Sequence, residues 1–227
     1  MANRPIYIAQ DTLPYIRIEH VDFKWHAGLS VSQKKKSIKS LHQAVLKQDP
    51  HLSLLEISTK SNNPIGVNLS AFNLRLDTTD GRSVPIENLF QSSKLFKNGG
   101  PFKDLLNVSP KMAKKDMRLQ ESGELVGFIS KDRIWPLKPS TIFYDWIYIN
   151  TLRSNEFLSG EIMNFNAFSD IEFNPKKSIN CQARSAALYV SLARNKLLDK
   201  VLESPDVFIK TLSKGLAIGD PKQGQLF

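Results

Sequence analysis

A carboxylate, an amide and an ammonium group recur at helical spacing between Gly81 and Asn98. If this segment is a helix, Glu87, Gln91, Lys94 and Asn98 fall within one narrow stripe, because successive helical residues are about 100° apart. The positions around the stripe are apolar, which is typical of a buried helix. Buried charged groups are costly unless they pair or meet a ligand. The stripe therefore predicts a ligand site, or else the solvated face of a surface helix, and the pattern alone favours neither.

Caps and turns predict the elements that position this stripe. Pro85 suits the first turn of the central helix, and the glycines of KNGGPF at 97–102 predict its end. Ser109 followed by Pro110 predicts the cap and first turn of a short helix over SPKMAKKDMRLQ. The Asp-Gly pair at 80–81 predicts a tight turn before the central helix.

The N-terminal region combines strands with a basic helix. Residues 5–25 are β-branched and aromatic, which predicts one or two strands. Ser32 predicts the N-cap of a helix over QKKKSIKSLHQAVLKQ, whose apolar edge consists of Ile38, Leu41 and Val45. The other positions hold Lys34, Lys35, Lys36, Lys39 and Lys47. These lysines either lie on DNA phosphates or form a solvated face.

The remaining segments predict short strands and helices. We expect strands at 52–58 (LSLLEIS), 67–77 (VNLSAFNLRLD) and 124–130 (ELVGFIS). Helices are expected at 139–153, 155–165 and 179–198, and an extended polar loop over FSDIEFNPKKS at 168–178. The tail after Leu212 should be loose.

The composition narrows the class of partner. A net charge of +9 and a pI of about 9.6 favour a polyanion such as nucleic acid, although basic enzymes with small phosphorylated substrates share this charge. No apolar run approaches the ~20 residues of a membrane span, and the N-terminus lacks a signal-peptide pattern, so we expect a cytoplasmic protein without a membrane partner. Cys181 is the single cysteine, and the four histidines form no ligand pair. Without a nucleotide-binding glycine fingerprint either, we expect no metal and no cofactor.

Four segments, in order, resemble the motifs of the NADAR family, which is named for NAD and ADP-ribose chemistry. NLSAF at 68–72 looks like the opening strand of the family, and 81–96 is similar to its G-K-x-W-P-x-x-E-H-Y-F-Q-A-x-K-F helix. Residues 109–118 resemble its S-P-x-x-A-x-x-x-G-R element, and 170–183 its closing D-x-x-W-G loop. The family histidine is Asn88 here, the tryptophan before the proline is Val84, and the W-G pair is Phe173-Asn174.

The basic N-terminal region resembles the subgroup that is encoded beside DarT DNA ADP-ribosyltransferase toxins. This resemblance implies an antitoxin that removes ADP-ribose from guanine bases of DNA, without a stable toxin complex being required. The alternatives are an N-glycosidase acting on phosphorylated riboflavin-pathway intermediates, and a non-catalytic antitoxin that binds ADP-ribosylated DNA or the toxin. The implied fold is a mostly helical α+β domain at 61–212, with an N-terminal extension at 1–60 packed on the core and a loose tail at 213–227.

The resemblance also implies roles for individual residues. Glu87 or Asp170 would stabilise the cation-like sugar or activate water as the N-glycosidic bond breaks. Lys94 would protonate the leaving nitrogen or, alternatively, attack the opened sugar as a Schiff-base nucleophile. The residues implied to contact substrate are Asn68, Ser70, Phe72, Gln91, Arg118 (for the pyrophosphate), Trp135 (for a base, with Trp146 as the alternative) and Asn180. For Phe72 and Trp135 the alternative is a plain core position.

Overall fold

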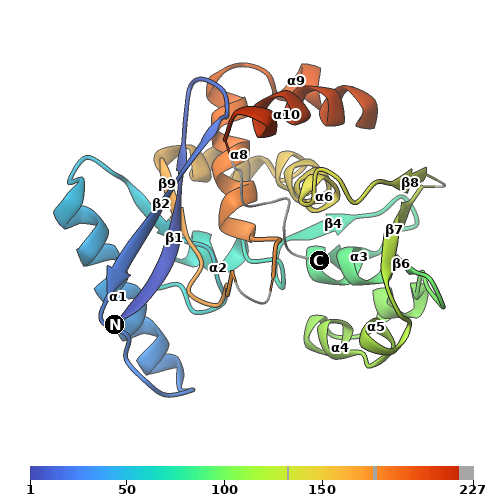
Figure 1. The fold of residues 1–227 in the computed structure, drawn as a ribbon, viewed down its shortest axis with the longest axis horizontal. Helices are drawn as coiled ribbons and strands as arrows, with labels where there is room; N and C mark the ends of the chain where they lie inside the picture. The colour runs from blue at the N-terminus through green and yellow to red at the C-terminus, as the bar shows by residue number, and fades with distance from the viewer. Residues whose placement is uncertain (132, 176–177, 220–227) are drawn as a thin grey trace.

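Three small β-sheets lie around two central helices (Figure 1). The computed structural model describes residues 1–131, 133–175 and 178–219. It shows an α+β fold with 44% helix and 20% strand, which confirms the predicted mostly helical class. In the view of Figure 1, a four-stranded sheet with helix α1 lies on the left, and a three-stranded sheet with helices α3 to α5 lies on the right. No described helix is long and apolar enough to cross a membrane.

The four-stranded sheet joins distant parts of the chain in the order β2-β1-β9-β3. Strands β1 (Ala2–Ala9) and β2 (Ile16–Phe23) form an antiparallel pair in the region where the sequence predicted one or two strands. Strand β9 (Ala167–Ser169) pairs antiparallel with β1 and parallel with β3 (Leu54–Glu56). We expected β9 to be loop. Three residues are too few to show an alternating pattern, and β9 is a strand only because partners far away in the sequence hold it.

Helix α1 (Val31–Gln48) packs on this sheet through the predicted face of Ile38, Leu41 and Val45, which are all buried. Its N-cap is Ser30 and not Ser32, since the Ser30 hydroxyl accepts a hydrogen bond from the Gln33 amide at 3.3 Å.

The segment after β3 is largely helical, so the strand predicted at 67–77 is wrong. Asn63 caps helix α2 (Pro64–Asn68) by accepting a hydrogen bond from the Ile65 amide at 2.9 Å, and Pro64 occupies the first turn. Extended backbone returns only in β4 (Arg75–Asp77), which forms a hairpin with β5 (Ser83–Pro85) around the predicted Asp-Gly turn. The cap and proline set the local structure despite the alternating pattern.

The central helix α3 runs only from Ile86 to Ser92, so the predicted stripe through Lys94 and Asn98 is wrong. The hydroxyls of Ser92 and Ser93 both donate to the Leu89 carbonyl, at 3.2 and 2.7 Å, where the helix ends. Such side-chain bonds compete with helical backbone bonds. Lys94 then begins strand β6 (Lys94–Phe96), and the glycines of KNGGPF follow this strand and not the helix.

The elements around α3 build the right side of the molecule. They are the 3-10 helix η1 (Lys103–Asn107), α4 (Pro110–Lys115), α5 (Arg118–Glu121), β7 (Leu125–Ser130) and β8 (Arg133–Trp135). The predicted cap of α4 is confirmed, since the Ser109 hydroxyl accepts from the Met112 amide at 3.3 Å. Strand β7 pairs with both β6 and β8, which completes the three-stranded sheet.

The C-terminal half supplies the two central helices, α6 and α8, and further helices beside them. They are α6 (Ile142–Arg153), α7 (Glu156–Glu161), η2 (Ile162–Asn164), α8 (Gln182–Arg194), α9 (Leu198–Val201) and α10 (Pro205–Gly219). A buried ion pair between Asp145 and Arg184 joins α6 to α8. Helix α10 continues beyond Leu212, where we predicted a loose tail, and residues 220–227 lie outside the described residues.

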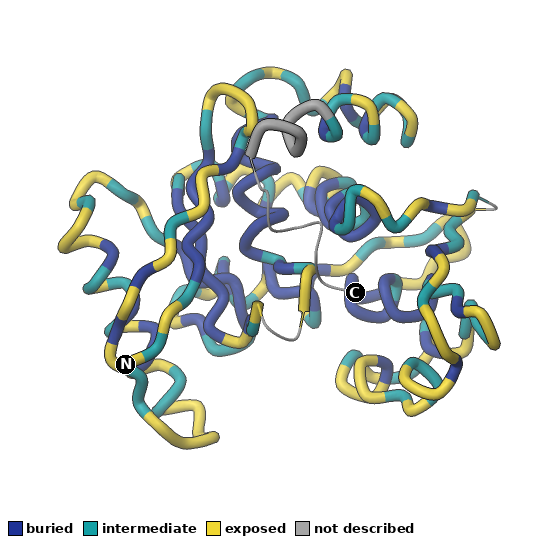
Figure 2. The backbone as a smooth tube through the Cα atoms, viewed as in Figure 1, coloured by how far each residue is buried: buried dark blue, intermediate teal, exposed yellow. Residues whose placement is uncertain are grey.

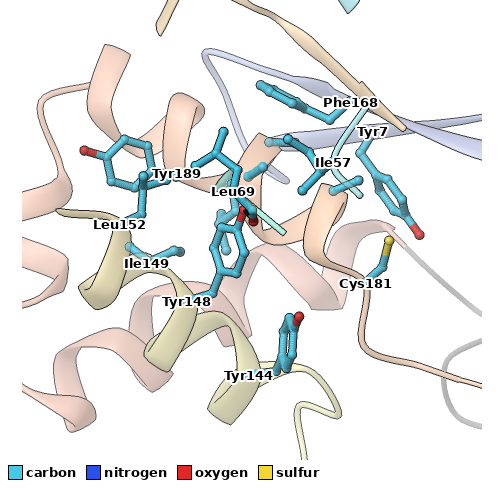
Figure 3. Packing of buried hydrophobic residues seen from close by; sticks show 14 of the residues in the cluster. Tyr7, Ile57, Leu69, Tyr144, Tyr148, Ile149, Leu152, Phe168, Cys181 and Tyr189 are labelled. Atoms are coloured by element: carbon cyan, nitrogen blue, oxygen red, sulfur yellow. Dashed lines mark hydrogen bonds between the residues drawn. The ribbon is translucent and has the colours of Figure 1, made fainter. Parts of the chain in front are cut away.

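The main core fills the space between α6, α8 and the four-stranded sheet (Figures 2 and 3). The Tyr148 hydroxyl donates to the Leu69 carbonyl at 2.8 Å, which fixes the end of α2 against α6. The Cys181 thiol is buried and hydrogen-bonds with the Tyr7 hydroxyl, which lies beside it in Figure 3. The thiol also donates to Asp170 Oδ2 at 4.0 Å, so Cys181 is held within the core beside this carboxyl group.

Candidate functional site

Glu87 is the buried carboxylate of helix α3, with 5% of its surface exposed. One turn later, the Gln91 amide donates to Glu87 Oε1 at 2.7 Å. Lys114 Nζ lies 3.6 Å from Glu87 Oε2. Within the described part of the chain, the buried Gln91 Oε1 has no hydrogen-bond partner. Of the two alternatives for the stripe, this part of it is buried and is not a solvated face, and Gln91 leaves one acceptor free beside the carboxylate.

Lys94 reaches the same place from strand β6. The pKa of Lys94 is lowered to about 8, and burial is the largest cause of this shift. The negative charge of Glu87 opposes the shift, whereas the positive charge of Lys114 adds to it. Its Nζ lies 5.0 Å from the centre of the Phe90 ring, and it has no hydrogen bond to any described residue. An amine with a pKa near 8 exchanges its proton readily at neutral pH, as proton transfer or nucleophilic attack requires.

Lys114, on α4, is a candidate site residue that the sequence pattern did not single out. Besides its contact with Glu87, its Nζ lies 5.5 Å from the centre of the Phe72 ring. Its charge also lowers the pKa of Asp170, so the Lys114 ammonium influences both carboxyl groups. Three lysines occur within the six residues of α4, and nothing in their sequence pattern distinguishes the one that turns towards Glu87.

Asp170 follows strand β9 and is buried. Its Oδ1 accepts hydrogen bonds from the amides of Glu172 and Phe173, at 3.0 and 3.1 Å. Burial and the charge of Glu56 raise the pKa of Asp170 to about 8, although the Glu172 amide and the Gln182 side chain oppose this shift. The raised pKa favours the protonated carboxyl group, so Asp170 is a candidate proton donor.

Glu56, which the sequence analysis did not select, holds both neighbours of Asp170. Its Oε1 accepts from the Ile171 amide at 2.8 Å, and its Oε2 accepts from the Ser169 hydroxyl. Ser169 also bonds with His42 Nε2 on α1 at 2.8 Å. Burial raises the pKa of Glu56 and lowers that of His42 to about 4. Glu56 lies within the apolar segment LSLLEIS, and β9 was not predicted, so this contact could not be anticipated from the sequence pattern.

The predicted substrate contacts divide into two groups. Phe72 is half-buried, and the Lys114 ammonium lies over its ring. The buried Asn180 Oδ1 has no hydrogen-bond partner among the described residues, so this oxygen is available to a ligand. Asn68 is exposed at the end of α2. The Ser70 hydroxyl is buried and already donates to the Val67 carbonyl at 2.7 Å. Ser70 is therefore a turn residue in this structure.

Arg118 and Trp135 have other partners than the ones we predicted. The Arg118 guanidinium pairs with Asp104 at 2.6 Å and Asp116 at 2.9 Å, and these carboxylates raise its pKa. The positive charge of Arg118 is therefore already balanced by these carboxylates, so this side chain is poorly suited to bind a pyrophosphate. Trp135 is 1% exposed and packs against Phe143 in the aromatic core, with ring centres 5.4 Å apart. It presents no free face to a base.

Trp146, the alternative to Trp135, is half-buried on α6 and packs against Trp135, with ring centres 5.3 Å apart, and against Phe208 at 5.2 Å. Both tryptophans thus belong to the core contacts around α6. Phe72 lies closer to the carboxylate site, because the Lys114 ammonium contacts both the Phe72 ring and Glu87.

Asn88, which replaces the family histidine, holds α3 to the next elements of the chain. Its Nδ2 donates to the carbonyls of Leu105 and Val108, at 2.7 and 2.8 Å. The residue is fully buried. Asn88 therefore fixes the segment between η1 and α4, and through it Lys114, relative to Glu87.

Comparison with known proteins gives one family. The family model described as DarT1-associated NADAR antitoxin matches residues 2–218, which is nearly the whole chain. No curated protein gives a significant match. The described residues contain no group of three histidine, cysteine or acidic side chains able to hold a metal ion.

Proposed function

We propose that this chain, which belongs to the DarT1-associated NADAR antitoxin family, removes ADP-ribose from guanine bases of DNA. By reversing the modification, it would act as the antitoxin to a DarT-type DNA ADP-ribosyltransferase. One observation carries the proposal: a buried carboxylate, Glu87, lies with Lys94 and Lys114 in one charged cluster that also reaches a carboxyl group with a raised pKa, Asp170. Ionisable groups whose pKa values are shifted by burial and by specific charged neighbours, as those of Lys94 and Asp170 are, are typical of active sites.

The proposed reaction breaks the bond between the anomeric carbon of ribose and a guanine nitrogen. The electron pair of that bond stays with the nitrogen, which takes a proton from Asp170. The cation-like sugar is stabilised by the Glu87 carboxylate, by analogy with glycoside hydrolysis. A water molecule adds to the anomeric carbon and gives its proton to Glu87, so the products are ADP-ribose and unmodified guanine.

A second route uses Lys94 as a nucleophile. Its lowered pKa and its lack of a hydrogen-bond partner among the described residues favour this route. Once the ribose ring opens, its C1 is joined to the guanine nitrogen as an imine. The neutral amine would attack this carbon, guanine would leave with its amino group restored, and water would later hydrolyse the lysine imine to give ADP-ribose and free Lys94. Borohydride reduces an imine to a stable secondary amine. Mass spectrometry of the protein after borohydride treatment with substrate should then find the adduct on Lys94, and no adduct would rule against this route.

The charge distribution supports DNA as the substrate rather than a small metabolite. Lys34, at the start of the basic helix α1, pairs at 3.2 Å with Glu172, which lies in the loop that follows Asp170. In the view of Figure 1, this loop lies between α1 and α4, the two helices richest in lysine. Positive charge on both sides of a reactive site favours a polyanion that extends beyond the reacting nucleotide.

The test is release of ADP-ribose from an oligonucleotide that carries ADP-ribosylated guanine, followed by mass spectrometry. We expect release by the wild type and its loss in Glu87→Gln and Lys94→Met. The matched controls are Glu203→Gln and Lys200→Met, which change the same residue types at exposed positions near α9. A folded wild-type protein that releases nothing would refute the proposal, and release by Glu87→Gln at the wild-type rate would refute the site.

A further inference from the structure

An open groove of about 380 Å³ lies beside α4, outside the cluster of Glu87, Lys94 and Asp170. Its lining residues come from η1, α4 and the turns around them: Asp104, Leu105, Val108, Lys111, Met112, Lys115 and Asp116. The volume is within the range of ~300–1,000 Å³ that small-ligand sites occupy. Three of the residues are apolar, so the groove has an apolar floor between charged walls.

A single arginine pairs with both carboxylates of the groove and offsets one of their two negative charges. Arg118 pairs with Asp104 at 2.6 Å and with Asp116 at 2.9 Å. Lys111 and Lys115 are exposed, and neither forms an ion pair with a described residue. They stand four residues apart and so share one face of α4. The charge that the groove offers to a partner is therefore positive.

The groove is fixed relative to the catalytic cluster. Lys114, between the two groove lysines in sequence, contacts Glu87 at 3.6 Å. Asn88, the neighbour of Glu87, holds the carbonyls of Leu105 and Val108 at 2.7 and 2.8 Å. A ligand strand bound in the groove would therefore reach the cluster of Glu87, Lys94 and Asp170 along α4. Lys111, on the groove side, lies about one helical turn before Lys114.

We propose that this groove binds the DNA strand next to the modified guanine. One unstacked base would lie on Val108 and Met112, above the buried Leu105, while Lys111 and Lys115 contact the flanking phosphates. Sites for single-stranded nucleic acid combine a surface that packs against bases with cations along the backbone. The inference rests on the proposed function for the identity of the substrate, but binding in the groove requires no catalysis.

The experiment compares Lys111→Ala/Lys115→Ala with a control of equal charge, Lys200→Ala/Lys210→Ala. Fluorescence anisotropy measures the binding of an unmodified single-stranded oligonucleotide as a function of salt. Each lost phosphate contact lowers the slope of log K against log salt by about 0.7 for single strands, so two contacts lower it by about 1.4. We expect this loss and at least a tenfold weaker binding in the groove variant only. Met112→Asp should weaken binding without removing a positive charge.

A second measurement uses two substrates, an ADP-ribosylated oligonucleotide and ADP-ribosylated guanosine. The groove variant should raise KM for the oligonucleotide about tenfold and leave cleavage of the nucleoside unchanged. Equal effects on both substrates, or equal effects of the control, would overturn the inference. So would normal DNA binding together with lost binding of the toxin, because the groove would then be a protein surface. If the wild type cleaves neither substrate but the groove variant alone loses oligonucleotide binding, the proposed function fails and the groove remains.

Discussion

Replacing Glu56 with glutamine should shift the pH dependence of the reaction. Burial and the Glu56 charge together raise the pKa of Asp170 to about 8. If protonated Asp170 is the proton donor, the rate of ADP-ribose release falls as the pH rises through about 8. Removing the Glu56 charge lowers the pKa of Asp170, because one carboxylate no longer disfavours ionisation of the other. The midpoint of the falling limb should therefore move to lower pH.

The size of the expected shift in the pKa of Asp170 follows from the effect of the Glu56 charge on this group. A like charge in direct proximity changes a pKa by about one unit or more, and one unit corresponds to ~1.4 kcal/mol. With a pKa of about 8, half of Asp170 is protonated at pH 8. A decrease of one unit leaves ~9% protonated, so the rate at pH 8 should fall about fivefold while the rate at pH 6 hardly changes.

The glutamine side chain can keep the hydrogen bonds of Glu56. Its oxygen accepts from the Ile171 amide, and its NH₂ group donates to the Ser169 hydroxyl, which in turn donates to His42. His42 accepts because it is neutral, with a pKa of about 4. The loop around Asp170 should thus stay in place, and circular dichroism with thermal unfolding would verify the fold.

The assay is the pH profile of kcat/KM between pH 6 and 9 for the wild type, Glu56→Gln and the exposed control Glu203→Gln. An unmoved midpoint in a folded Glu56→Gln protein would show that Asp170 is not the titrating donor. Lys94, whose pKa is also about 8, does not depend on Glu56 and would then be the donor. A rate that rises through pH 8 would refute both donors and favour the neutral amine of Lys94 as nucleophile.

Three further predictions concern stability, measured by urea unfolding. Asp145→Asn should cost about 3–5 kcal/mol, because it leaves the buried guanidinium of α8 without its charged partner; a loss below 1 kcal/mol would contradict this. Gly66→Ala should destabilise the fold by several kcal/mol, since a Cβ at Gly66 would lie 2.0 Å from the Glu56 carbonyl oxygen, whereas Gly160→Ala, with nothing within 4 Å, should be neutral or slightly stabilising. The pKa of His42 is lowered from 6.5 to about 4. As the pH falls, the unfolded chain therefore binds the proton on His42 before the folded chain does. Between pH 6.5 and 4, the free energy of unfolding of the wild type should decrease by up to about 3 kcal/mol more than that of His42→Gln. Equal decreases in the two proteins would count against the burial of His42.

The sequence predicted best where the local signal and the tertiary contacts agree. The buried face of α1 followed from the spacing of its apolar residues, and the cap of α4 followed from its serine and proline. The Asp-Gly hairpin likewise forms as its turn chemistry requires. These features depend on residues within a few positions of one another, which is the range that sequence patterns cover.

Features that depend on distant partners could not be predicted from the sequence. Lys94 is a strand residue because β7 pairs with it, although its spacing from Glu87 fits a helix. Glu56 reaches Asp170 only because β3 and β9 are neighbours. Lys114 and Lys111 look alike in sequence, and only the tertiary fold turns the first towards Glu87 and the second towards the groove. Arg118 matches a family motif, yet two nearby carboxylates occupy it.

The position of β9 between β1 and β3 has a consequence for the order in which the protein becomes active during synthesis. Glu87 and Lys94 leave the ribosome long before Ala167–Ser169, and until then the facing edges of β1 and β3 have no strand between them. Pairing over such a sequence separation is slow, and open strand edges invite wrong partners in the meantime. A nascent chain thus carries Glu87 and Lys94 without the loop that holds Asp170, and under the proposed function its activity would begin only when β9 closes the sheet.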